Sequence, residues 1–175
     1  MSDVAPVVRL RQLIRGFQPT HLIYAAAELG IADHLADGPK TSAELASLVG
    51  AHAGALHRVL RALAQLGVLT SREDGCFGLT PMGELLRSDV PGSQRHHARL
   101  WGHALFQRPY LHLLHTIKTG EIAFDHTYGQ EFFSYLADHP EEAAIFDRGM
   151  AGGSAPFLEN IVAAYDYSNL VPCQP

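Results

Sequence analysis

Residues 41–81 constrain the fold more than any other part of the chain, because strong helix signals are followed there by a strong hairpin signal. Thr41 lies three residues before Glu44, the spacing of a helix capping box, so a short helix is expected to follow Thr41. A second helix is expected over residues 54–66, where leucine and valine recur at three- and four-residue steps. Asp74-Gly75 then separates two short β-prone runs, which is typical of a hairpin turn.

The order of these elements is that of a winged helix. Pro81 suits the first turn of one more helix after the hairpin, which completes the order helix, turn, helix, hairpin, helix. We therefore predict a mainly α fold class in which residues 1–90 form a winged-helix-like domain with a small β-hairpin. No stretch of the sequence predicts a Rossmann domain.

Helices are also expected before this core. From residue 7 to residue 35 apolar side chains recur at helical steps, with an interruption at Gly16 and Pro19. An apolar helical face this close to a chain end needs a surface to cover it, and a second copy of the chain would provide one. We therefore expect a homodimer joined in part through these helices.

The second half of the chain is expected to be helical. Pro91-Gly92-Ser93 is the expected linker, and residues 94–170 follow it as one helical segment. The expected elements are a helix over residues 94–118 bent at Pro109, a loop over 120–129, a helix over 132–136, and a helix over 141–165 broken at Gly152-Gly153.

Composition narrows the class of protein. Hydrophobic residues make up 47% of the chain and charged residues 18%, a balance that disfavours disorder. No apolar run approaches the ~20 residues of a membrane span, and two cysteines are too few for a disulfide framework. We expect a cytoplasmic protein with no membrane partner, and the net charge of −5 disfavours nucleic acid as the main partner.

Four segments carry motifs in a characteristic order. They are Thr41-Ser42-Ala43-Glu44 with residues 56–63 (LHRVLRAL), residues 77–86 (FGLTPMGELL), residues 120–136 (GEIAF, then YG and FFSYL), and Phe146-Asp147-Arg148-Gly149-Met150 with residues 163–168. Together they resemble the N-terminal half of bacterial small-molecule O-methyltransferases that depend on S-adenosylmethionine. The resemblance covers about residues 8–170 and is closest to the polyketide-tailoring, anthracycline-type branch.

This resemblance implies that the two halves of the chain have different functions. In the family the winged helix joins two subunits instead of binding DNA, and the helices that follow line the substrate pocket. S-adenosylmethionine is bound further on, by a doubly wound domain that opens with a glycine-rich turn. This sequence instead ends in Val171-Pro172-Cys173-Gln174-Pro175, where two prolines disfavour a buried strand. We therefore expect residues 171–175 to be a non-family tail and the chain alone to bind no S-adenosylmethionine.

The resemblance also indicates which side chains would bind substrate. Phe146 and Met150 would face a flat aromatic substrate and touch the edge of the cofactor site, and a polarisable thioether suits such a ring. Ordinary core packing is the alternative for each aromatic residue. The candidate substrate-binding residues are Trp101, Tyr128, Phe133, Phe146 and Met150, and no residue is a candidate for catalysis.

The chain contains eleven histidines, which raises the question of a metal site. His112 and His115 share a helical face, but zinc needs three or four convergent ligands, usually with a cysteine or a carboxylate. No such motif is visible in the sequence, so we predict no metal site.

We therefore interpret the chain as the dimerisation and substrate-binding region of an O-methyltransferase for an aromatic or polycyclic natural product. A separate chain carrying the missing cofactor domain would then be a possible partner. One alternative is a stand-alone binding or scaffold protein derived from such an enzyme. The other is a winged-helix DNA-binding regulator, in which His57, Arg58 and Arg61 would meet the DNA.

Overall fold

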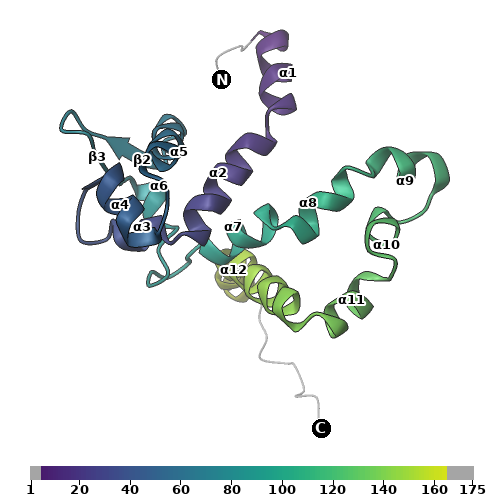
Figure 1. The fold of residues 1–175 in the computed structure, drawn as a ribbon. Coiled ribbons are helices and arrows are strands. Elements are labelled where there is room, and N and C mark those ends of the chain that lie inside the picture. The colour runs from purple at the N-terminus through teal and green to yellow at the C-terminus, as the bar shows by residue number, and fades with distance from the viewer. Residues whose placement is uncertain (1–4, 165–175) are drawn as a thin grey trace.

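The computed structural model describes residues 5–164, and the side chains of residues 5–153. Two regions lie on either side of a central group of helices (Figure 1). One region, here called the head, contains a small sheet and short helices. The other, here called the arm, is a curved succession of short helices. The expected tail over residues 171–175 lies outside the described residues.

The head has the predicted winged-helix order. Its elements are α3 (Ile31–His34), β1 (Lys40–Thr41), α4 (Ser42–Val49), α5 (Ala53–Gln65), β2 (Leu69–Ser71), β3 (Cys76–Leu79) and α6 (Pro81–Glu84). The predicted capping box is present: the Thr41 hydroxyl accepts a hydrogen bond from the Glu44 N–H at 3.3 Å, and the Glu44 carboxylate accepts one from the Thr41 N–H at 2.7 Å. The mainly α fold class is confirmed.

The sheet has one strand more than the sequence predicted. β2 and β3 form the expected antiparallel hairpin, with Leu69 opposite Leu79 and Gly75 in the left-handed region at φ 80°. The additional strand β1 pairs antiparallel with β3 on its other side, which gives the order β1-β3-β2. β1 is only two residues long and forms through this long-range pairing, so it has no local sequence signal. Phe77 of β3, 1% exposed, packs into the core of the head with Leu45, Leu60 and Leu63.

Helices α1 (Pro6–Ile14) and α2 (Phe17–Glu28) precede the head. The predicted interruption at Gly16 is present, whereas Pro19 lies in the first turn of α2, where no helical N–H is required. α1 has no buried residue and projects away from the rest of the chain (Figure 1). Leu13 and Ile14 are 61% and 65% exposed, so the predicted apolar face is uncovered in the single chain.

The second half is helical, but three of its expected boundaries are wrong. Residues 94–118 form three helices and not one, residues 120–129 contain a helix and are not a loop, and the last helix continues through Gly152-Gly153 without a break. His103 separates the first two helices: its backbone is extended, at ψ 143°, and its ring accepts a hydrogen bond from the Leu105 N–H. The elements are α7 (Arg95–Gly102), α8 (Ala104–Tyr110), α9 (Leu113–Thr119), α10 (Ala123–Tyr128), α11 (Phe132–Asp138) and α12 (Pro140–Ala164).

Helix α7 packs against both α2 and α12. Glycines at these crossings allow the helices to approach one another closely. A methyl group at Gly102 of α7 would overlap the ring of Tyr24 on α2, with only 2.6 Å to Cδ2. A methyl group at Gly149 of α12 would lie 2.7 Å from Cδ2 of Leu100. Gly153, one turn later, faces the ring of His97. These glycines therefore mark a helix crossing and not a helix end, which explains why the sequence-based break was wrong.

Polar contacts reinforce this central group. The Arg95 guanidinium pairs with the Asp33 carboxylate at 2.5 Å and donates to the Ala27 carbonyl at 3.0 Å. Arg99 of α7 pairs with Glu28 of α2 at 2.8 Å. Among the described helices, none combines the length and the hydropathy that crossing a bilayer requires.

Candidate functional site

Aromatic rings from α7, α8, α10, α11 and α12 form one connected group, here called the aromatic cluster. Phe106 of α8 lies at its centre, with ring centroids 6.0 Å from Trp101, 5.9 Å from Phe132 and 6.2 Å from Phe146. The Phe106 and Phe146 rings are stacked, with an angle of 15° between their planes. The members are Trp101, Phe106, Phe124, Tyr128, Phe132, Phe133, Tyr135 and Phe146.

One edge of this cluster is open to solvent. Phe146 is half-buried and packs edge-on against Phe132, at 5.2 Å between ring centroids. Phe133, 6.4 Å from Phe146, is 66% exposed. Met150 lies one turn beyond Phe146 on α12 and is 46% exposed, so both residues present apolar surface along the same side of the helix. The chain thus offers an apolar face bordered by Phe133, Phe146 and Met150.

Tyr128 has a structural contact as well as a place in the cluster. Its hydroxyl donates to the carbonyl oxygens of Ala104 and Leu105, at 3.3 and 3.4 Å, and so ties α10 to the start of α8. Burial raises the pKa of the Tyr128 phenol above its ordinary value. Its ring packs 4.8 Å from that of Tyr135. The hydroxyl therefore remains protonated at neutral pH and holds the arm in shape.

Trp101 lies at the opposite end of the cluster, beside a second feature that the sequence did not reveal. It is 41% exposed and lines an apolar cavity of about 290 Å³ between α2, α6 and α7, together with Ile23, Met82 and Leu86. Such a volume is close to the ~300 Å³ at which small-molecule sites begin. The ring of His97 also borders this cavity, and its buried Nδ1 has no hydrogen-bond partner within residues 5–153.

The structure therefore brings together four of the five predicted substrate-binding residues. Trp101, Tyr128, Phe133 and Phe146 belong to the aromatic cluster, and Met150 adjoins it through Phe146. Phe106 belongs to the aromatic-rich set of the second half of the sequence but was not a candidate for substrate binding, although its ring links Trp101 to the rest of the cluster.

Comparison with known proteins finds similarity to methyltransferases. The model of the O-methyltransferase dimerisation domain matches residues 11–89. Phenazine O-methyltransferase PhzM of Lysobacter antibioticus is 45% identical over 159 residues, which cover 91% of this chain and 46% of that protein. The chain thus spans about half the length of the curated relatives it matches.

Solved structures agree with this relationship. The crystal structure of LaPhzM has a TM-score of 0.88 at 43% identity, covering 94% of this chain and 49% of that one. An O-methyltransferase from neocarzinostatin biosynthesis, solved with S-adenosylmethionine and 2-hydroxy-5-methyl naphthoic acid, has a TM-score of 0.69 at 35% identity and covers 87% of this chain and 47% of its own. The resemblance recognised in the sequence is confirmed, and in the intact family S-adenosylmethionine is the cofactor.

The predicted winged helix thus lies in the region that matches the dimerisation-domain model, and the helices that follow it are shared with a solved relative. Residues 11–89 match the O-methyltransferase dimerisation domain, and the chain is similar to bacterial natural-product O-methyltransferases over most of its length.

Proposed function

We propose that this chain joins two subunits and supplies the aromatic wall of the substrate pocket in an O-methyltransferase for a polycyclic aromatic natural product. In this proposal residues 1–90 form the dimerisation domain and residues 94–170 the substrate wall, with residues 91–93 as the linker. The observation that carries it is the open edge of the aromatic cluster, where Phe133 and Met150 are exposed beside the half-buried Phe146. Large exposed apolar patches usually mark a binding surface.

The flat, ring-lined shape of this face supports an aromatic ligand. Aromatic rings prefer edge-to-face and offset-stacked neighbours, and an added ring at this edge would meet both Phe133 and Phe146 in such arrangements. The thioether of Met150 would follow the outline of a flat ligand. Trp101 and Tyr128 would support the wall from behind: Trp101 through its contact with Phe106, and Tyr128 through its hydrogen bonds to α8.

S-adenosylmethionine does not fit the described residues. A cofactor site of the doubly wound type needs a parallel strand that leads through a glycine-rich turn into a helix. The strands of this sheet are antiparallel, and β1 leads directly into α4 at Ser42 without a glycine. We therefore assign no catalytic residue in this chain and derive no methyl-transfer step from it. The proposal requires a cofactor domain of that type next to the described residues.

The proposal also includes a homodimer located in the cytoplasm. The homodimer is supported by the apolar face that α1 and the start of α2 share. Its side chains Leu10, Leu13 and Phe17 are each more than half exposed in the single chain. Nucleic acid is not a partner in this proposal, because His57 packs edge-on against Phe77 at 5.7 Å and the chain carries a net charge of −5.

Two measurements on the 175-residue chain test this function. Light scattering at micromolar concentration should give the mass of a dimer. A hydrophobic fluorescent dye should bind the chain, and Phe133→Ser or Met150→Ser should weaken that binding. Leu48→Ser is the matched control, since Leu48 is an exposed apolar residue of the head, 54% exposed. A monomeric mass, or equal dye binding by all three variants, would contradict the proposal.

A further inference from the structure

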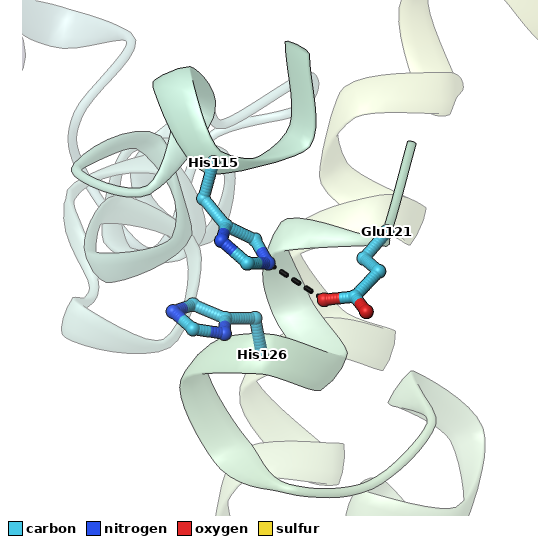
Figure 2. A group of neighbouring side chains, drawn as sticks. All are labelled: His115, Glu121 and His126. Carbon is cyan, nitrogen blue, oxygen red and sulfur yellow. Dashed lines mark hydrogen bonds and ion pairs between the residues drawn. The ribbon is translucent and has the colours of Figure 1, made fainter. Parts of the chain in front are cut away.

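A second group of side chains gathers where α9 turns into α10, on the arm. His115 of α9, Glu121 of the connecting turn and His126 of α10 face one another (Figure 2). One ring nitrogen of each histidine and one carboxylate oxygen all lie within 4.8 Å of one another. The distance from His115 Nε2 to the Glu121 carboxylate is 2.7 Å.

The local backbone holds this group in place. The Thr119 hydroxyl donates to the His115 carbonyl at 2.9 Å and accepts from the Glu121 N–H at 3.1 Å. Gly120 is in the left-handed region, at φ 79°, and reverses the chain. As a result, Glu121 points back toward His115, and α10 then brings His126 alongside.

The two histidine rings lie unusually close to each other. Their centroids are 3.8 Å apart and the rings are nearly parallel, at 16°. A third ring, that of His112, packs edge-on against His126 at 4.9 Å. A ring nitrogen of each of His115 and His126 thus lies beside the same carboxylate.

We propose that His115, Glu121 and His126 form a binding site for a divalent transition-metal ion of the zinc type. Two imidazole nitrogens and one carboxylate oxygen are ligands that zinc prefers, and a site with three protein ligands retains a further position for water. The ion would replace the hydrogen bond between His115 Nε2 and the Glu121 carboxylate, since an atom that binds the metal cannot also carry a proton. The expectation of no metal site was based on neighbouring histidines such as His112 and His115; the turn at Gly120 adds a carboxylate and a further histidine to His115.

The consequence of metal binding would be structural. α9 and α10 have no buried residue, so little apolar packing holds them together. An ion bound to residues from both helices and their turn would connect them directly. Binding that is specific to the folded state also raises its stability.

Calorimetric titration of the full chain with zinc chloride tests the site. The chain should bind one zinc ion per chain with micromolar affinity or better, and zinc should raise the midpoint of thermal unfolding. His126→Gln and Glu121→Gln should each weaken binding at least tenfold and abolish that rise. His34→Gln is the control, because it removes a histidine from the head with the same change of side chain.

The side chains of Glu121 and His126 are exposed, so these variants should keep the fold, which circular dichroism would check. If the wild-type chain binds no zinc, or if His126→Gln binds it as tightly as His34→Gln, the proposal is overturned. The group would then be a His–Glu ion pair beside a stacked ring.

Discussion

Helices α7 and α12 cross closely, so alanine should have opposite effects on stability at two glycines of α12. These are Gly149 and Gly152. In a helix interior, alanine is favoured over glycine by about 1 kcal/mol. At Gly152 a methyl group would meet its nearest neighbours at 3.6 and 3.7 Å, which is ordinary contact. Gly152→Ala should therefore raise the free energy of unfolding by about 1 kcal/mol.

At Gly149 the same change should destabilise the fold. The new methyl group would lie 2.7 and 2.9 Å from Cδ2 and Cγ of Leu100, and closer still to its Cβ. Leu100 is 1% exposed, so it has no space into which to move. Overpacking of this kind costs about 1–3 kcal/mol, which exceeds the gain in helix propensity, and a net loss of about 1 kcal/mol is expected.

The two variants should thus differ by about 2 kcal/mol, or roughly 4–8 °C in the midpoint of thermal unfolding for a chain of this size. Urea and thermal unfolding followed by circular dichroism would measure both quantities. If Gly149→Ala proved as stable as Gly152→Ala, α12 would not approach α7 at this distance, and the explanation of the unbroken helix would fail.

Three further changes test contacts elsewhere. Asp33→Ala should lower the free energy of unfolding by about 1–3 kcal/mol in urea titration, because the partly buried Arg95 loses its ion-pair partner. Gly83→Ala should cost about 1–3 kcal/mol in the same assay, because the new methyl group would overlap a backbone carbonyl. In Thr41→Ala, NMR titration should show a higher pKa for Glu44, since hydrogen bonds from Thr41 hold that pKa below its ordinary 4.5. A lowered folded-state pKa gives stability that is present above pH 4.5 and lost as the pH falls through the folded value, so the variant should lose less stability on acidification than the wild type.

Local signals predicted most of the head well, because several of its elements begin or end on a short-range interaction. The capping box of Thr41 and Glu44 and the turn at Gly75 are complete within four residues or fewer, and the structure has both. β1 was missed since its two residues become a strand only by pairing with Phe77 and Cys76, more than thirty positions away.

The arm was harder to predict, because its boundaries depend on less specific signals. The break at His103 depends on a histidine ring that accepts a backbone N–H, and histidine has no strong preference for that role. Glycine is ambiguous in sequence, since it ends helices and also permits close helix crossings. Gly152-Gly153 was interpreted as a helix break, whereas the contacts of Gly149 with Leu100 and of Gly153 with His97 show a helix crossing.

The candidate site, too, was predicted only in part from the sequence. Aromatic residues between positions 101 and 146 could be collected by type, but the central place of Phe106 became visible only in the ring contacts of the folded chain. Likewise, His112 and His115 were visible as a pair on one helix, whereas His126 joins them only because Gly120 reverses the chain.

The uneven burial of the chain has a consequence for its motions. α9 and α10 contain no buried residue, and the apolar side chains of Leu111, Leu114 and Ile117 are 70% exposed or more. Amide hydrogens exchange most readily where few buried contacts oppose local opening. Exchange should therefore be fast in α9 and α10 and slow at the crossing of α2, α7 and α12. The aromatic cluster includes residues of α7, where exchange should be slow, and of α10, where it should be fast. A protein surface that covers the exposed apolar side chains of the arm would therefore also hold in place the face formed by Phe133 and Phe146.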